Sequence, residues 1–469
     1  MAPKVTPVLD PAFRPPVLAN RAFRALASAS GQAVPVTVAL EQADGSVFHF
    51  STEVLPEAHP AAEGNSLVIE RWLKFLLWSR GGYRVYFAGP AALAQALQRH
   101  YLEARAGVFD ANIMGARVYE RPFEVRLTRR EELPPACART QPLGRHWNGC
   151  RVGFDLGGSD RKVAAVIDGK TVFSEEAPWD PIPQADPQWH FDQIMQGLKR
   201  AAEHLPRVDA IGGSAAGIYV NNRVKVASLF RGVPPEPFER RAKDLFLELQ
   251  RAWGGVPLEV VNDGEVTALA GSMSLGDNAV LGLALGTSTA GGYVTPEGNI
   301  TSWLNELAFV PVDYQPHAPV DEWSRDAGCG AKYFSQQCVG RLAEVAGLEI
   351  EPSQPLPETL KFVQTLMLAG DYRARKIYET IGTYLGYAVA HFADFYDFRH
   401  VLLLGRVTSG PGGDLLLRGA RQVLEAEFPD LLERVALHLP DEKAKRHGQA
   451  VAAASLPVVA AAPGAQLAS

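Results

Sequence analysis

The sequence predicts an α/β protein with two lobes of similar plan, preceded by a small α+β domain. Strand-like and helical runs alternate over residues 151–455, which is typical of α/β architectures with partly parallel sheets. An apolar strand that ends in a glycine-rich turn occurs twice in this region, about 130 residues apart. Such an internal repeat indicates two similar lobes that face each other over a cleft.

The N-terminal module, residues 34–130, starts with a predicted β-hairpin. Apolar and polar residues alternate on both sides of Asp44-Gly45, a dipeptide that favours a tight hairpin turn. Apolar residues then recur with helical spacing until Gly81-Gly82 stops the helix. The Pro- and Ala-containing residues 1–33 are expected to form an extended arm over another domain. The predicted elements of the module are strands over residues 34–41, 46–52, 83–88 and 118–128 and helices over residues 66–80 and 90–101.

The rest of the chain divides into two predicted lobes. Residues 131–150 contain three prolines and few apolar periods, which suits a linker. We therefore predict an accessory domain over residues 1–145, a first lobe over 146–262 and a second lobe over 263–444. A C-terminal helix at about 445–458 is expected to pack back on the first lobe. Strands are predicted over residues 152–154, 163–167, 210–212, 258–261, 280–285 and 401–404, and helices over 191–204, 237–252, 373–395 and 415–427.

Composition and charge exclude several classes of protein. The chain has 469 residues, of which 47% are hydrophobic and 21% are charged, so it is neither disordered nor fibrous. Its formal net charge of -6 argues against a general nucleic-acid binder, which would be clearly basic. The charge is uneven, because residues 1–150 carry +4 and the remainder carries -10. This asymmetry supports a separate N-terminal unit.

The lack of a recognisable targeting signal and the low number of cysteines predict a cytoplasmic protein. The N-terminus lacks the apolar core of a signal peptide, and no run of about 18 apolar residues occurs that could span a membrane. The four cysteines form no CxxC pair and are too few for a disulfide framework. We therefore expect free thiols.

The two repeated turns are candidate phosphate-binding loops. Glycine lets backbone N–H groups approach a phosphate closely, and Ser and Thr hydroxyls add donors. Either turn alone is better explained as a simple tight hairpin. Their pairing, together with a third glycine-rich turn over residues 405–413, favours a polyphosphate site. The residues that would hold the phosphates are Gly157, Gly158 and Ser159 in the first turn and Gly286, Thr287, Ser288 and Thr289 in the second.

Asp155 precedes the first turn and lies within an apolar strand. A carboxylate is costly there unless a cation or a hydrogen bond compensates it. A Mg²⁺ ion on nucleotide phosphates, bound directly or through water, would be a natural partner. The alternative is a structural, hydrogen-bonded Asp.

Asn262 and Asp263 follow an apolar strand and precede a helical run. Both residue types are ordinary helix N-caps, which is the structural interpretation. However, a carboxylate at the C-terminal end of a strand in an α/β sheet faces the usual ligand crevice. Asp263 could there accept a proton from an attacking hydroxyl.

Taken together, these motifs resemble the ROK family of bacterial sugar kinases, within the hexokinase/actin-like ATPase superfamily (ribonuclease H-like fold). The resemblance spans roughly residues 151–455 and leaves residues 1–145 outside. It implies the two-lobed actin-like ATPase fold, with Asp263 as general base and Asn262 as a sugar contact. It further implies that Glu306 binds the sugar and that residues 401–410, including Gly405, Arg406 and Gly410, form the adenosine motif.

Four departures from the family pattern alter the predicted sugar and adenosine sites. Phe309 stands where the family has a His associated with sugar and zinc, and Arg406 stands where Gly is usual. Ser228 falls near the place of a sugar-binding Asn. The Cys-rich zinc loop is reduced to Cys329, with Cys338 beyond it. Because zinc needs about four N, S or O ligands, we predict no structural zinc.

The sequence thus predicts a cytoplasmic sugar kinase that uses ATP and Mg²⁺. Its partner would be a small-molecule sugar rather than a membrane or nucleic acid, and a homodimer is one option for its assembly. The alternative is a non-catalytic sugar-binding or transcription-regulatory protein on the same fold, since fold does not decide activity. A third option is a scaffold whose N-terminal module binds another protein or a second subunit.

Overall fold

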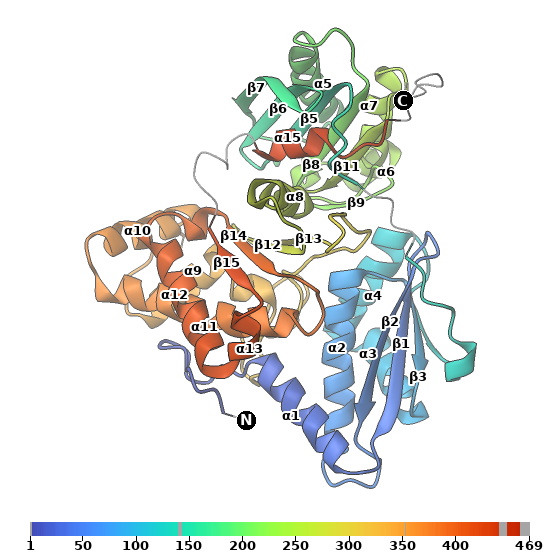
Figure 1. Cartoon of the computed structure of the whole chain (residues 1–469), viewed down its shortest axis with the longest axis vertical. Coiled ribbons are helices and arrows are strands. Elements are labelled where there is room, and N and C mark those ends of the chain that lie inside the picture. Colours follow the sequence, from blue (N-terminus) through green and yellow to red (C-terminus); the bar gives the residue numbers. More distant parts are fainter. Residues whose placement is uncertain (1, 139–142, 352, 440–447, 460–469) are drawn as a thin grey trace, which may run out of the picture. The chain divides into compact units, whose positions relative to one another are not determined.

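The computed structural model describes residues 2–138, 143–351, 353–439 and 448–459 (Figure 1). The chain forms two compact units, which we describe separately. The first unit comprises residues 1–140, 281–291 and 302–439, and the second comprises residues 141–280, 292–301 and 440–469. The N-terminal module therefore shares a unit with most of the predicted second lobe.

The second unit contains a five-stranded sheet in the order β11-β8-β5-β6-β7. Strand β5 pairs in parallel with β8 and antiparallel with β6, while β8 pairs in parallel with β11 and β6 antiparallel with β7. The predicted strands of this region are confirmed. Their bounds are Cys150–Leu156 (β5), Asp160–Ile167 (β6), Lys170–Pro178 (β7), Ala210–Ala215 (β8) and Leu258–Asn262 (β11), with the small hairpin Ile218–Val220 (β9) and Arg223–Val226 (β10).

Helices flank this sheet because each has one apolar face to bury. Helix α5 (Pro187–Ala202) begins at the N-cap Asp186, whose side chain accepts from the Gln188 N–H. The helix predicted over residues 237–252 is wrong as a single element. It divides into α6 (Pro235–Arg240), a 3₁₀ turn and α7 (Leu245–Ala252), because the chain leaves helical geometry at Arg241, with φ -144°.

The C-terminal helix α15 (Gly448–Ala454) packs on the same sheet (Figure 1). Gly153 and Gly212 allow the contact, since an added Cβ would lie 1.8 Å from Ala450 O and 1.7 Å from Ala453 O, respectively. The end of the chain therefore packs on the sheet of the second unit. The first residues of the range expected for this helix, 445–447, lie outside the described part.

The first unit contains the sheet β13-β12-β14-β15 and a helical layer. Helix α11 is almost wholly buried, and its Gly382 meets Gly419 of α12 at backbone distance. The predicted strands over 280–285 and 401–404 and the predicted helices near 373 and 415 are confirmed. The bounds are Val280–Leu285 (β12), Thr289–Val294 (β13), His400–Leu404 (β14), Ala436–His438 (β15), Gln336–Val345 (α9), Leu356–Leu368 (α10), Tyr372–Phe392 (α11), Pro411–Glu427 (α12) and Pro429–Leu432 (α13).

The N-terminal module forms a four-stranded sheet in the order β2-β1-β3-β4 with helices α2 and α3 packed on it (Figure 1). The predicted hairpin and the next three elements are confirmed. The strand over 118–128 is largely wrong, because Ile113–Tyr119 form a π-helix that ends at Glu120 with φ 55°. The bounds are Val34–Glu41 (β1), Val47–Val54 (β2), Gly64–Arg80 (α2), Arg84–Ala88 (β3), Ala91–Glu103 (α3), Arg105–Asn112 (α4) and Glu124–Leu127 (β4).

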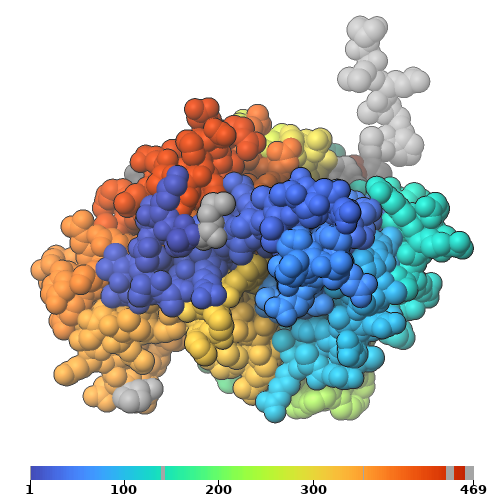
Figure 2. All heavy atoms as spheres, turned by 90° about the horizontal axis from the view of Figure 1, so that it is seen from below, coloured from blue at the N-terminus to red at the C-terminus, as the bar shows by residue number. Residues whose placement is uncertain are grey.

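The residues before this module lie along helix α11. Tyr387 Oη and Thr380 Oγ1 accept from the Val5 and Leu9 N–H groups, and Phe13 packs 4.7 Å from the Tyr384 ring. The N-terminal residues lie against those of the 300–440 region on the surface drawn in Figure 2. The expected arm is confirmed, although its second half is a helix, α1 (Pro16–Ala29).

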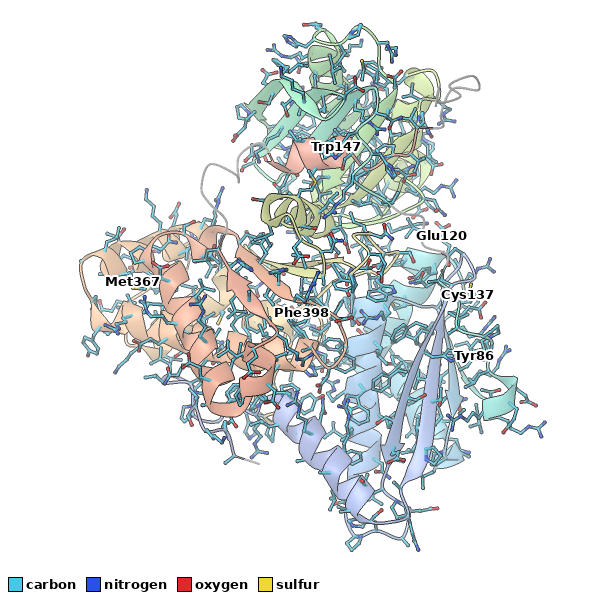
Figure 3. All side chains as sticks on the ribbon, in the orientation of Figure 1. Tyr86, Glu120, Cys137, Trp147, Met367 and Phe398 are labelled. Atoms are coloured by element: carbon cyan, nitrogen blue, oxygen red, sulfur yellow. The ribbon has the colours of Figure 1, made fainter. Side chains whose placement is uncertain are left out.

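All four cysteines are free, as expected, and Cys137 is the exposed one (Figure 3). Phe398, in the connection between α11 and β14, is buried (Figure 3). Within the described residues, no helix is both long enough and apolar enough to cross a membrane.

Candidate functional site

Asp155 is buried in β5 between polar side chains of the two neighbouring strands. The sheet register places Lys162 of β6 and Ser214 of β8 opposite it. Ser214 Oγ donates to Asp155 Oδ1 at 2.6 Å, and Lys162 Nζ lies 3.4 Å from Asp155 Oδ2. Burial raises the pKa of Asp155, although Lys162 and Ser214 oppose the shift. A hydroxyl and an ammonium therefore offset the cost of a carboxylate inside an apolar strand.

The first glycine-rich turn, Gly157-Gly158-Ser159, joins β5 to β6. The Gly157 N–H donates to Asp160 O at 2.9 Å, which closes the hairpin. Gly158 and Ser159 are exposed, and the space that a Cβ on Gly158 would occupy is open. The turn is thus a tight hairpin whose outer residues are accessible to a ligand.

Asp263 begins helix α8 (Asp263–Leu275), directly after β11. Its Oδ1 accepts from the Gly264 N–H at 3.0 Å. Burial and the negative charge of Asp155 together raise the pKa of Asp263 to about 6. The carboxylate is therefore mainly ionised at pH 7 and remains basic enough to accept a proton.

Asn262 is the N-cap of α8, as the structural interpretation predicts. Its Oδ1 accepts from the Gly264 N–H at 2.7 Å, and its Nδ2 donates to Gly217 O at 2.7 Å. Gly217 in turn lies against Val226 O and Ala227, the residues that precede Ser228. Ser228 is exposed in a 3₁₀ turn. The structure thus brings Asn262 and the segment of Ser228 to one region of the second unit.

The second and third glycine-rich turns meet in the first unit. Gly405, with φ 99°, lies so close to β12 that an added Cβ would be 2.4 Å from Leu285 O. Leu285 immediately precedes Gly286, whose carbonyl accepts from the Gln336 N–H at the start of α9. Thr287 and Ser288 are exposed. Thr289 is buried instead, and its Oγ1 donates to Phe334 O at 3.1 Å.

Arg406 and Gly410 border the third turn. The Arg406 side chain is exposed, while its carbonyl accepts from Gln364 Nε2 at 2.9 Å. Gly410 is the N-cap of α12, with φ 67°. The amino end of a long helix lies beside the two turns, and helix amino ends favour anionic groups.

Glu306 and Phe309 lie in a coil that contacts the N-terminal module. The Glu306 N–H donates to Trp78 O at 3.0 Å. The Phe309 ring packs on the Trp78 ring, with centroids 4.2 Å apart. Both residues are partly exposed. Phe309, which stands where the family has a His, thus packs on Trp78, a residue outside the region of family resemblance.

Cys329 and Cys338 are separate, buried thiols. Burial raises the pKa of Cys329 to about 12 and that of Cys338 to about 11, so both are protonated at neutral pH. Among the described residues, no three His, Cys, Asp or Glu side chains gather into a metal-binding group. The absence of zinc stays a prediction.

Solved structures have the same fold. The ROK hexokinase from Thermus thermophilus matches with a TM-score of 0.52, over 66% of this chain and 97% of the hexokinase, at 21% identity. The chain has the ROK fold. The predicted α/β actin-like ATPase architecture is thereby confirmed.

Two further proteins resemble this ROK-fold chain. A ROK family glucokinase from Streptomyces griseus, solved in complex with glucose and AMPPNP, matches over 66% of this chain and 99% of that protein, with 19% identity and a TM-score of 0.49. A glucokinase from Halalkalibacterium halodurans is 30% identical over 186 residues, which are 36% of this chain and 54% of the glucokinase. The chain thus matches about half of that relative's length. No protein-family model matches the chain.

Sequence reasoning on the ROK-fold region missed three residues near Asp155. Ser214 and Lys162 contact its carboxylate, and Trp179 Nε1 donates to Gly157 O at 2.8 Å. The strand alternation around Lys162 was a usable signal, because residues paired across a hairpin share a face. Ser214 and Trp179 carried no such local signal.

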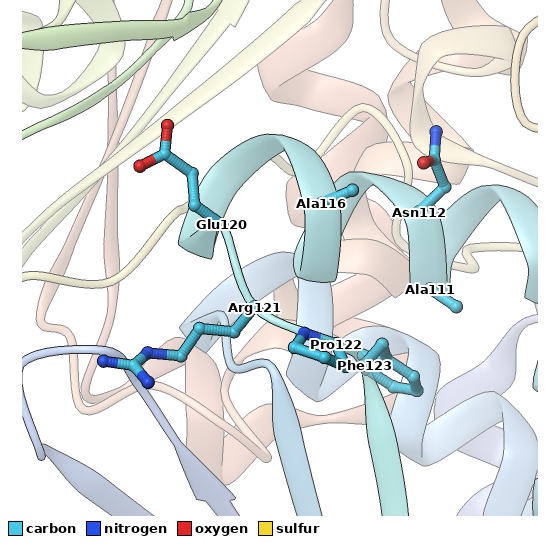
Figure 4. A pocket seen from close by; sticks show the side chains of 7 residues that line it. All are labelled: Ala111, Asn112, Ala116, Glu120, Arg121, Pro122 and Phe123. Atoms are coloured by element: carbon cyan, nitrogen blue, oxygen red, sulfur yellow. The ribbon is translucent and has the colours of Figure 1, made fainter.

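A cavity of about 640 Å³ lies in the N-terminal module, outside the predicted site. Its lining includes Asn112, Glu120, Arg121 and Phe123, between the π-helix and β4 (Figure 4). Figure 4 shows the Glu120 and Arg121 side chains projecting apart, which leaves no converging polar groups to orient a ligand. We assign it no role.

Proposed function

We propose that the protein is an ATP-dependent sugar kinase of the ROK family. It transfers the γ-phosphoryl group of ATP to a hydroxyl of a monosaccharide or sugar derivative. The observation that carries this proposal is Asp263, a carboxylate with a raised pKa at the end of a parallel strand. The likeness to a hexokinase and a glucokinase supports the class of acceptor.

Asp263 is the proposed general base. As the sugar hydroxyl oxygen forms a bond to the γ-phosphorus, its proton passes to the Asp263 carboxylate. The bond from phosphorus to the bridging oxygen breaks, and ADP leaves with that electron pair. A base with a pKa of about 6 suits this task, because it is free to accept a proton at neutral pH.

The three glycine-rich turns are proposed to hold the nucleotide. The exposed N–H and hydroxyl groups of Gly158, Ser159, Thr287 and Ser288 would bind phosphate oxygens, and the loop over residues 405–410 would border the adenosine. Asp155 would supply the oxygen donor that Mg²⁺ prefers, either directly or through water. When bound, Mg²⁺ would neutralise the charge of the phosphates.

Release of ADP tests the proposal across a panel of monosaccharides, measured with a coupled assay. Asp263→Asn should lower kcat by at least about 100-fold, the usual contribution of a general base, while sugar affinity in calorimetry stays within about twofold.

The matched control is Asp160→Asn, which removes a carboxylate near the first turn without touching the proposed base. This variant should retain most of kcat. Turnover by Asp263→Asn at the wild-type rate would refute the base assignment. Sugar and nucleotide binding by the wild type without any turnover would favour the non-catalytic alternative.

A further inference from the structure

Helix α2 of the N-terminal module ends against the segment that carries Glu306. The last four carbonyls of a helix have no partner within the helix. In α2 the Leu77 carbonyl accepts from Gly81 N–H, and the next two, Trp78 O and Ser79 O, accept from the Glu306 and Asn305 N–H groups at 3.0 and 3.1 Å. The helix end therefore holds the backbone of the segment at two consecutive residues.

The fourth carbonyl extends this attachment. Arg80 O accepts from Gln42 Nε2 at 2.6 Å, and Gln42 Oε1 accepts from Ser302 Oγ at 3.2 Å. The turn at Gly81, with φ 82° and with Tyr119 Oη in the place of a Cβ, directs the chain away from the helix end. The segment thus supplies hydrogen-bond donors to the last carbonyls of α2, and these hydrogen bonds hold the backbone of the segment in place.

Side chains of α2 add two contacts around the same segment. The Trp78 ring packs on the Phe309 ring with centroids 4.2 Å apart, and Trp78 Nε1 donates to Asp110 Oδ1 at 2.9 Å. The Arg80 guanidinium lies 4.3 Å from the centre of the Tyr396 ring, and Tyr396 Oη donates to Asn305 Oδ1 at 2.7 Å. Both sides of Glu306 are therefore anchored to α2.

A buried ion cluster links the helix to the coil that follows. Lys74 Nζ is completely buried and lies 2.9 Å from Asp110 Oδ2 and 3.1 Å from Asp326 Oδ2. Arg71 contacts the same Asp326 at 2.9 Å. Because a buried charge without its partner is strongly unfavourable, this cluster ties the module to the coil over residues 320–330.

We propose that Trp78 is a positioning residue for the sugar-binding segment, so that the N-terminal module is part of the acceptor site. This inference rests on the proposed function and on the sugar-binding role that the family resemblance implies for Glu306. The module would act through the backbone of Asn305 and Glu306 and through the ring of Phe309. A displaced binding carboxylate loses affinity for the acceptor steeply, because the hydrogen bonds depend on its position.

Kinetics of the full-length Trp78→Leu variant test the proposal. We expect KM for the sugar to rise about tenfold, while KM for ATP stays within about twofold, since the contacts described for Trp78 are with the segment of Glu306 and with Asp110. Trp78→Phe keeps a ring on Phe309 and should restore most of the sugar KM. The matched control is Leu67→Ala, at an exposed position of the same helix, which should behave as wild type.

Hydrogen exchange on the same proteins gives a readout independent of turnover. Amides of residues 302–309 should exchange faster in Trp78→Leu, whereas those of residues 286–289 should not. A sugar KM unchanged in a folded Trp78→Leu variant, or equal losses for sugar and ATP, would overturn the inference and leave the proposed function standing. A wild type that neither binds nor phosphorylates any sugar would refute the proposed function itself.

Discussion

Asp263 shows how two neighbouring carboxylates acquire different properties from their surroundings. Asp155 has an ammonium and a hydroxyl within reach, whereas the hydrogen bond to Asp263 comes from the backbone N–H of Gly264. The charge of Asp155 adds to the effect of burial, so the pKa of Asp263 rises to about 6. Different environments of this kind give two neighbouring carboxylates different pKa values, so that one can act as a base while the other stays ionised.

This pKa predicts the pH dependence of activity. The proposed base must be ionised, so kcat should be constant above pH 7 and fall about tenfold per pH unit below about pH 6. Initial rates with saturating sugar and ATP between pH 5 and pH 8 measure the profile. A kcat that stays flat down to pH 5 would contradict the assignment.

The same shift sets the sign of the stability effect. Because the folded pKa exceeds the ordinary value of 3.8, the ionised carboxylate is disfavoured in the folded state and its protonation stabilises the fold. Asp263→Asn should therefore show a Tm equal to or above that of the wild type at pH 7. Loss of activity in that variant would then reflect chemistry rather than unfolding.

At the scale of elements, the packing of α15 on the sheet depends on two glycines. The carbonyls of Ala450 and Ala453 occupy the positions that side chains would take on β5 and β8. Close approach of a helix backbone to a strand excludes even a methyl group. Helix α15 can therefore pack on β5 and β8 only because Gly153 and Gly212 have no side chains.

Gly212→Ala should destabilise the second unit by about 1–3 kcal/mol, the usual cost of overpacking a core. Urea unfolding followed by fluorescence measures the change in the free energy of unfolding. Gly64→Ala is the control, because it lies at the start of α2 in open space and should be neutral or slightly stabilising. Equal stability of both variants would show that α15 does not pack as described.

At the scale of the whole molecule, the N-terminal module belongs to the first compact unit. Its Lys74 compensates Asp326, and the Asn305 and Glu306 N–H groups donate to carbonyls at the end of α2. The Phe13 ring also packs among tyrosines of the helical layer. The module is therefore an integral part of the first unit rather than a separate appendage.

Removal of residues 1–138 should therefore abolish soluble expression or cooperative unfolding of the remaining chain. The deletion would leave Asp326 without its buried ammonium and would expose the apolar faces that α1 and α2 cover. Yield and thermal unfolding of the truncated chain measure the effect. A stable truncated protein with native-like unfolding would contradict the prediction.

The sequence by itself determined most strands and helices, the two glycine-rich hairpins and the order of the motifs, because these features depend on patterns within a few residues. The sequence did not predict the break in the helix at Arg241 or the π-helix at 113–119. In both places, tertiary packing overrides the backbone conformation that the local sequence favours. Only the tertiary structure decided that Ser214 hydrogen-bonds to Asp155 and that Trp78 holds the segment of Glu306. Such contacts join residues far apart in the chain, and no local periodicity encodes which buried donor meets which acceptor. The charge asymmetry at residue 150 indicated a separate N-terminal unit, whereas the structure places this module, with its buried Lys74–Asp326 pair, in the first compact unit.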